Sequence, residues 1–308
     1  MSKFKVKVLG VTDYESKDSN HGDCFAIYNQ ATKKMIVYDC GSEQHAEAII
    51  KLMNDKGIKK TDIILSHNDG DHFDGIPKLI EEDKVDRIFT TLLLKYVDDI
   101  LEMLDDDRRT RKATKERILE LYDNIAQLSG TALKDIYEDS LELPIGINFI
   151  GPEKDTMIEA VSKAVKKDDT SIQIDNETIV NSTSLQISVE VKDGTKLLLL
   201  GDTSVKNVLC DLKEYKYIHL PHHGKLASAE DIFEIITNDP HDSFTDHTFI
   251  VSDNTGNSNG GSDALMSSSA RKGKTIKNTK ISGALELKKP VYQTNEKARE
   301  HYGLCFGL

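Results

Sequence analysis

The sequence predicts an α/β fold in which outer helices cover mixed β-sheets. Apolar runs rich in Val, Ile, Tyr and Phe recur along the 308 residues and are separated by turn-forming Asn, Gly and Asp. One run is followed by a segment with helical spacing and then by another apolar run, and this strand–helix–strand order is typical of a mixed sheet with helices outside. Because no stretch of roughly 18 apolar residues is present, we expect no membrane-spanning helix.

The amino-terminal part alternates short strands with turns. Strands are predicted over residues 4–9, 24–28 and 35–38. A helix is predicted over 43–54, because apolar residues recur there at helical spacing and Lys56-Gly57 is a helix-ending signal. The short apolar run 62–66 then completes a strand–helix–strand unit.

Residues 97–143 differ from both flanks, since they are strongly helical and charged. Their basic residues gather in one short run, formed by Arg108, Arg109, Arg111, Lys112, Lys115 and Arg117. The run indicates either a solvated helix pair whose charges pair locally, or an arm that offers positive charge to an anionic substrate.

Strand patterns return in the carboxy-terminal part. The predicted strands are 147–150, 185–191, 196–200, 217–220, 248–252 and 281–287, with a hairpin turn at Asp193-Gly194 and a polar loop over 254–269. No linker separates the two strand-rich halves. We therefore predict a single domain, 1–308, with a helical insertion at about 97–143.

The net charge is −12, because 52 Asp and Glu stand against 40 Lys and Arg. Such a balance argues against a protein held to nucleic acid by its overall charge, although a local basic groove or a metal would still supply positive charge. The amino terminus has no apolar signal-peptide core, so we expect a cytoplasmic protein. The cysteines lack Cys-x-x-Cys spacing and are interpreted as free buried thiols; they are Cys24, Cys40, Cys210 and Cys305.

The densest group of chemically active residues comes directly after the predicted strand 62–66. Residues 66–75 read Ser-His-Asn-Asp-Gly-Asp-His-Phe-Asp-Gly, and the candidate metal ligands among them are His67, Asp69, Asp71 and His72. Neutral imidazole and carboxylate are the ligands expected for zinc, manganese or iron. A loop at a strand end can aim alternate side chains at two neighbouring points, which suits a site with two metal ions.

Two further motifs also stand at strand ends. The apolar run 197–200 ends in Gly201 and Asp202, and the run 218–221 is followed by His222 and His223. Each motif alone has an ordinary interpretation as a turn. Together with the first motif, they predict one metal site at the edge where these loops meet.

These motifs resemble those of the metallo-β-lactamase fold family. His67-x-Asp69-x-Asp71-His72 is similar to the family signature His-x-His-x-Asp-His, and the variant with Asp in the second position resembles the soluble metallohydrolase domain of the competence DNA-uptake channel ComEC. The other segments that resemble this group are 22–27, 38–41, 181–185, 200–202 and 222–224. The resemblance covers about residues 4–89 and 147–287 and implies an αββα sandwich of two mixed β-sheets with outer helices.

The resemblance also implies a dinuclear centre whose ligands are His67, Asp69, Asp71, His72, Asp202 and His223. His67 and Asp69 would hold one metal, and Asp71, His72 and His223 the other, with Asp202 as the bridge. The sequence leaves open which of His222 and His223 binds metal; we assign His223 as the ligand and let His222 face the substrate. Asp71 and His222 are the candidate catalytic residues, and the implied cofactors are two divalent ions, Zn or Mn.

The sequence departs from the family pattern at two places. No histidine precedes Asp202 where the family has its third motif; that region contains Asn181, Ser182 and Ser184. The loop 259–263 has no histidine where the ComEC-type domain carries Gly-His-Pro, and His247 comes before the strand that leads into it.

We expect a metal-dependent hydrolase, in the first place a phosphodiesterase or nuclease that uses a dinuclear centre and a bridging hydroxide. Two adjacent cations lower the pKa of a shared water towards about 7 and stabilise charge on phosphodiester oxygens. The expected substrate is a nucleic acid or nucleotide. We also expect a partner protein, and we expect no association with a membrane. The alternatives are hydrolysis of a small ester, lactone or phosphocholine-type substrate, and a non-catalytic binding module with a decayed site.

Overall fold

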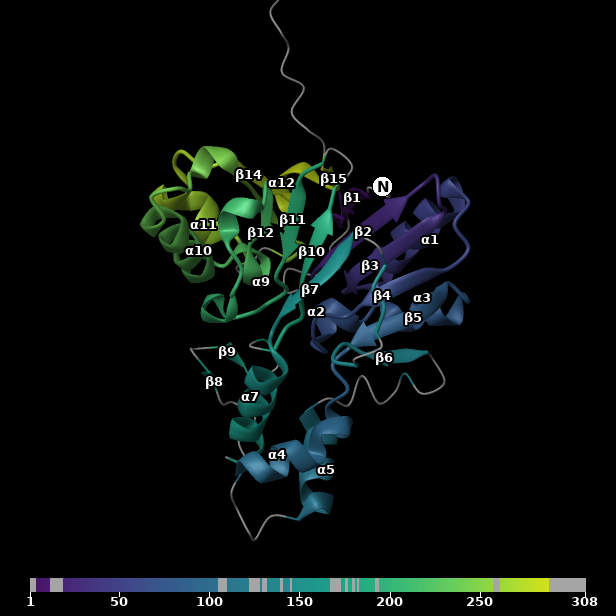
Figure 1. Cartoon of the computed structure of the whole chain (residues 1–308). Helices are drawn as coiled ribbons and strands as arrows, with labels where there is room; N and C mark the ends of the chain where they lie inside the picture. Colours follow the sequence, from purple (N-terminus) through teal and green to yellow (C-terminus); the bar gives the residue numbers. More distant parts are fainter. Residues whose placement is uncertain are drawn as a thin grey trace, which may run out of the picture.

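Two mixed β-sheets lie face to face in the centre of the structure, and helices cover the outer side of each (Figure 1). The computed structural model describes residues 4–11, 19–104, 110–121, 128, 132–138, 141–144, 146–166, 173–174, 177–178, 181, 183–191, 194–256 and 261–287. The order of layers is helix, sheet, sheet, helix. This order confirms the predicted αββα sandwich.

The first sheet has the strand order β15-β1-β2-β3-β4-β5-β6. Its pairs are antiparallel from β15 to β3 and parallel from β3 to β6. The strands are β1 (Lys5–Val8), β2 (Cys24–Asn29), β3 (Lys34–Cys40), β4 (Thr61–Ile64), β5 (Val85–Thr90), β6 (Leu133–Asp135) and β15 (Leu285–Glu286).

The second sheet has the order β14-β13-β12-β11-β10-β7. Its pairs are parallel from β14 to β11 and antiparallel from β11 to β7. The strands are β7 (Ile147–Gly151), β10 (Gln186–Glu190), β11 (Lys196–Leu199), β12 (Tyr217–His219), β13 (Thr248–Val251) and β14 (Ile276–Asn278). A separate short hairpin joins β8 (Gln173–Ile174) to β9 (Glu177–Thr178).

Alternating side chains of the strands build the apolar layers. Phe25 of β2 and Leu199 of β11 lie in the cluster between the sheets, whereas Ala26 and Leu198 lie in the clusters under the outer helices. Both faces of each sheet are covered, so the strands read as nearly continuous apolar runs. The covering helices are α1 (Glu43–Lys56) and α3 (Ile76–Glu81) on the first sheet, and α10 (Leu226–Asn238) and α11 (Asp263–Ser267) on the second.

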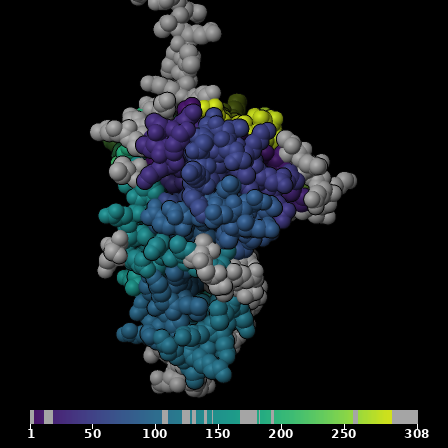
Figure 2. Space-filling view, turned by 90° about the vertical axis from the view of Figure 1, so that its right-hand side faces the viewer, coloured from purple at the N-terminus to yellow at the C-terminus, as the bar shows by residue number. Residues whose placement is uncertain are grey.

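A helical lobe extends from one end of the sandwich. It consists of α4 (Val97–Leu104), α5 (Arg111–Leu121) and α7 (Lys154–Lys166), which share a separate apolar cluster. Figure 1 places the lobe beyond the end of the sheets where the short helices α2 (Gly70–Phe73) and α9 (Pro221–Gly224) lie. In the space-filling view of Figure 2, the lobe lies below the purple and blue residues of the first-sheet half.

Several local expectations differ from the structure. The predicted insertion 97–143 is not helical throughout, because Leu133–Asp135 pairs with β5 as an edge strand, and the lobe also takes in α7 beyond residue 143. The predicted loop 254–269 contains α11. The predicted strand 281–287 contains the end of helix α12 (Thr279–Ser282) and only the two residues of β15.

Some sequence features lie outside the described residues. They are Arg108, Arg109, Ser182, Asp193, Cys305 and residues 259–260. Among the described cysteines, Cys24 and Cys40 are buried free thiols as predicted, whereas Cys210 is only half-buried. Within the described ranges, no helix has both the length and the hydropathy that a bilayer-spanning segment requires.

Candidate metal centre

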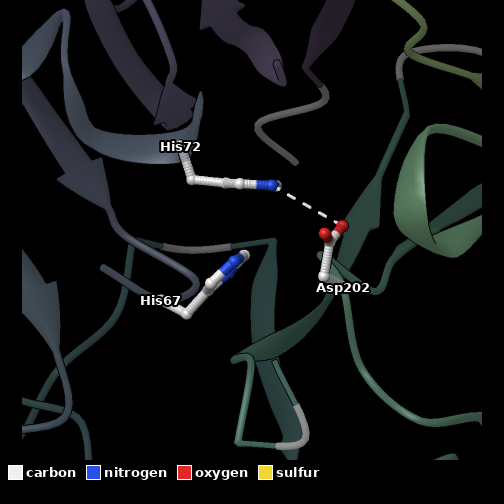
Figure 3. Close-up of side chains that lie close together, drawn as sticks. All are labelled: His67, His72 and Asp202. Carbon is white, nitrogen blue, oxygen red and sulfur yellow. Dashed lines mark ion pairs between the residues drawn. The ribbon is translucent and has the colours of Figure 1, made fainter. Parts of the chain in front are cut away.

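The three strand-end motifs meet at the end of the sandwich where the two sheets come together. His67 and His72 follow β4 of the first sheet, whereas Asp202 follows β11 of the second. In Figure 3, the two imidazoles reach from one side towards the Asp202 carboxylate on the other. His72 Nε2 lies 3.6 Å from Asp202 Oδ1. Each sheet therefore contributes part of one site.

One group of candidate ligand atoms comes from His67, His72 and Asp202, and all of these atoms lie within 4.8 Å of one another. Asp69 adds a carboxylate oxygen 3.6 Å from His67 Nε2. The Asp69 side chain is 43% exposed, whereas His67 is buried, so Asp69 stands at the solvent side of the group. The structure thus brings together the residues predicted for the first metal.

A second group comes from Asp71, His72 and His223, again with ligand atoms within 4.8 Å of one another. His223 Nε2 lies 2.9 Å from Asp71 Oδ2. His222 instead contacts Asp202: its backbone N–H donates to Oδ1 at 3.1 Å, and its Nδ1 lies 3.2 Å from Oδ2. The two adjacent histidines therefore contact different carboxylates, His222 that of Asp202 and His223 that of Asp71.

The turn that carries these histidines has a left-handed backbone. The φ angles of His222 and His223 are 54° and 52°. This conformation costs a non-glycine residue roughly 1–2 kcal/mol, and it persists only where surrounding contacts enforce it. The bonds from His222 to Asp202 and from His223 to Asp71 are such contacts. The turn directs its two rings to different parts of the site.

Asp39 orients His72 from behind. Its fully buried Oδ2 lies 2.8 Å from His72 Nδ1, and Ser66 donates its backbone N–H to Oδ1 and its hydroxyl to Oδ2, both at 2.7 Å. With Nδ1 engaged, Nε2 is the His72 nitrogen that faces Asp202. Asp23, Asp39 and His72 also form a close group, but these hydrogen bonds already occupy Asp39, so we assign no metal there.

Ser184 stands beside His67, in the region where the family would have its third-motif histidine. Its Oγ lies 3.2 Å from His67 Nδ1 and accepts the backbone N–H of Asp202 at 3.3 Å. Ser66 Oγ also lies 2.9 Å from His67 Nδ1. Both hydroxyls thus contact the ring nitrogen opposite the one near Asp69. Ser184 fits an orienting role and does not replace the missing ligand.

Two buried ring nitrogens test whether the site fits a metal. His67 Nε2 and His72 Nε2 are buried and make no hydrogen bond to any described residue. A buried nitrogen without a partner costs roughly 1–3 kcal/mol, which coordination would offset. Imidazole nitrogens with carboxylate oxygens are ligands that Zn and Mn accept. The residues therefore fit divalent ions, and the two groups are adjacent because they share His72.

The charges of the site stabilise one another. Burial by itself lowers the pKa of His72, but the Asp202, Asp71 and Asp39 carboxylates outweigh burial and hold that pKa well above its ordinary value. Burial by itself raises the pKa of Asp202. His72 and His222 lower that pKa by more than burial raises it, so it ends well below its usual range. The Asp202 carboxylate is therefore ionised and available to a cation.

Sequence reasoning missed the residues that orient the ligands. Asp39, Ser66 and Ser184 were not assigned roles, and Asn20 donates its side-chain N–H to Asp71 Oδ2 at 2.6 Å. The sequence signal that could have indicated such a residue is a polar side chain at the end of an apolar strand, as at Asp39.

His247 is not part of the site, since its ring contacts Asp242 and the Tyr215 carbonyl.

No protein-family model matches this sequence, and no curated protein matches it. Among solved structures, the chain is similar to the metallo-beta-lactamase fold protein YhfI from Bacillus subtilis, with 15% identity and a TM-score of 0.36 over 70% of each chain. It is also similar to the B3 metallo-beta-lactamase BLEG-1, with 15% identity and a TM-score of 0.33 over 64% of this chain and 71% of that one.

A third similar structure is the metallo-beta-lactamase from Staphylococcus aureus subsp. aureus COL, with 11% identity and a TM-score of 0.36. The match covers 81% of this chain and 55% of that one. None of these three names points to the ComEC group, so that finer resemblance stays a prediction.

Proposed function

We propose that this protein is a metal-dependent hydrolase of phosphodiesters. The observation that carries the proposal is the meeting of two buried, unsatisfied imidazole nitrogens, of His67 and His72, with the carboxylates of Asp71 and Asp202. Such a donor set is costly to bury unless cations complete it.

The proposed centre holds two divalent ions, Zn or Mn. His67, Asp69 and Asp202 would hold the first, and Asp71, His72 and His223 the second, with Asp202 shared between them. Asp202 fits the shared role because its carboxylate groups with His67, a proposed ligand of the first ion, and with His72, a proposed ligand of the second. Asp39 keeps the His72 ring in place through its Nδ1.

When bound, the ions supply a water of lowered pKa and positive charge for the reacting oxygens. Asp71 Oδ2 lies 2.9 Å from His223 Nε2, so two of the proposed ligands of the second ion face each other. His222, held by Asp202 through Nδ1, is proposed to face the substrate.

A phosphodiester is the favoured substrate class for this donor set. Its transition state spreads negative charge over oxygens that two cations can reach together. Carboxylate-rich ligand sets also suit Mn better than purely imidazole sets do. We propose a nucleic acid or a nucleotide as the physiological diester.

The test combines metal analysis with a substrate panel. Purified protein is assayed for bound metal, then incubated with bis-(p-nitrophenyl) phosphate, DNA, RNA and cyclic dinucleotides, each with Zn, Mn or Mg and with a chelator control. A small lactone and a phosphocholine ester complete the panel. Diester cleavage that the chelator abolishes supports the proposal, whereas cleavage of the lactone or phosphocholine ester alone favours the alternative hydrolase.

Variants locate the activity. We expect Asp71→Ala and His72→Ala to lower kcat/KM for the chromogenic diester by about a hundredfold or more, which is about 2.7 kcal/mol or more in the barrier. Asp86→Ala removes an exposed carboxylate of β5 and serves as the matched control. Wild-type turnover in either ligand variant at saturating metal would show that the assigned site is wrong.

A further inference from the structure

Two fully buried residues that the proposed mechanism does not use lie behind His223. They are Asp23, which directly precedes β2, and His219, the last residue of β12. Asp23 Oδ1 lies 3.1 Å from His223 Nδ1. Asp23 Oδ2 lies 3.2 Å from His219 Nε2, in close contact but without hydrogen-bond geometry.

The surroundings of His223 Nδ1 decide where its proton sits. This nitrogen lies 3.1 Å from Asp23 Oδ1 and also 3.1 Å from the carbonyl oxygen of Ser252. A carbonyl oxygen can only accept, so Nδ1 carries the proton and donates it. Nε2, which faces Asp71 Oδ2 at 2.9 Å, is then the nitrogen through which His223 would coordinate a metal.

His219 is not placed to bind a metal with the other ligands. It belongs to none of the close ligand groups in the described part of the chain. The ring of Phe25 packs edge-on against it, with the ring centroids 5.0 Å apart.

The contacts form one chain from the interior to the site. His219 lies 3.2 Å from Asp23, Asp23 lies 3.1 Å from His223, and His223 lies 2.9 Å from Asp71. Asp39 relates to His72 in the same way, at 2.8 Å from Nδ1. We propose that Asp23 is a positioning residue for His223, and that His219 holds Asp23 in place. This inference rests on the metal centre of the proposed function.

Strand β13, which leads to Ser252 beside His223, offers a matched control at its other end. His247 directly precedes β13, and its Nε2 lies 2.6 Å from Asp242 Oδ1 while its Nδ1 lies 2.7 Å from the Tyr215 carbonyl. Ser252, which contacts His223, directly follows β13. The strand rises about 3.3 Å per residue, so its four residues separate the control pair from the site by more than about 13 Å.

The experiment measures binding of Zn²⁺ and of Mn²⁺ to metal-free protein by calorimetric titration, with the Tm of each metal-free variant alongside. We expect Asp23→Asn to weaken one of the two binding sites by about 10–100-fold, since the loss of an outer partner of a ligating histidine has effects of that size. His219→Leu should weaken the same site, and His219→Gln, whose amide N–H can still reach Asp23, should restore most of the affinity. Asp242→Asn should leave both affinities unchanged.

Wild-type affinity at both sites in Asp23→Asn would overturn the inference, as would a loss no greater than that of Asp242→Asn. His219→Gln binding as weakly as His219→Leu would overturn the role of His219. The outcome is separable from that of the proposed function. Two ions bound without any diester cleavage would refute the activity and leave the positioning role standing, whereas cleavage with an unaffected Asp23→Asn site would refute the positioning role alone.

Discussion

At the scale of single residues, Asp202 connects the contributions of the two sheets. It comes from the second sheet, and its Oδ1 lies 3.6 Å from His72 Nε2 of the first-sheet motif. Its Oδ2 lies 3.2 Å from His222 Nδ1. Asp202→Asn keeps the shape of the side chain and removes its charge, so we predict that it lowers the affinity for both metal ions together. Calorimetric titration with Zn²⁺ measures this, and loss of only one metal would make Asp202 a terminal ligand of that metal.

The buried ring of His45 makes the stability of the fold depend on pH. This buried residue of α1 makes no hydrogen bond through its ring to any described residue, and burial lowers its pKa from 6.5 to about 3. Well above pH 6.5 the ring is neutral in both states. Below it, the unfolded chain gains a proton that the folded chain does not, so stability falls as the pH decreases towards about 3.

The linkage amounts to about 2 kcal/mol between pH 7.5 and pH 5 for this one group. His45→Leu removes the titrating ring. Between pH 7.5 and pH 5, we therefore predict that the free energy of unfolding falls less in His45→Leu than in the wild type, by about 2 kcal/mol. Urea denaturation of both metal-free proteins at each pH gives the comparison. Parallel falls in the two proteins would contradict the prediction.

At the scale of elements, two turns of the first sheet fix the short helix α2. Asp23 donates its backbone N–H to the Asp71 carbonyl at 3.0 Å. A Cβ added at Gly41 would lie 2.0 Å from that same carbonyl oxygen, which is backbone and cannot move aside cheaply. The absence of a side chain at Gly41 therefore lets α2 sit against the sheet.

We predict that Gly41→Ala destabilises the protein by about 1–3 kcal/mol, the usual range for overpacking, and weakens metal binding because Asp71 moves with α2. The control is Gly151→Ala, where the added Cβ would come no closer than 3.6 Å to a neighbouring side chain. Urea denaturation and Zn²⁺ titration of both variants check the two effects. Equal stability of the two variants would show that close packing of α2 on Gly41 is not needed.

The strands and the strand-end motifs can be predicted because both are local. Apolar runs such as that of β11 report burial on two faces, and a ligand directly after a strand is carried to the sheet edge. The three-residue β6 has only one buried residue and forms because β5 lies beside it, so no local pattern reveals it. The contact of Asp39 with His72 is likewise tertiary, since these residues are 33 positions apart.

At the scale of the whole molecule, the net charge of −12 sets a limit on anionic partners. The sequence suggests the basic run of the lobe as a local source of positive charge. In the structure three of its four described members meet acidic side chains nearby: Arg111 lies 2.7 Å from Asp98, Lys112 lies 3.8 Å from Glu116, and Arg117 lies 2.7 Å from Glu120. These ion pairs favour a solvated helix face over a guiding arm.

Neutralising the lobe tests this choice. A variant with Gln at Arg111, Lys112 and Lys115 is compared with one that has Gln at Lys33, Lys34 and Lys60, which are exposed residues of the first-sheet side and give the same change in net charge. Binding of a long single-stranded DNA is measured as a function of salt. A guiding arm would lose about one unit of slope for each phosphate contact removed. Because Arg111 and Lys112 already have acidic partners, we predict that the slope changes by less than about one unit and equally in both variants. We also predict that Tm falls slightly in the lobe variant. A slope that flattens only in the lobe variant would establish the arm as a route for the substrate.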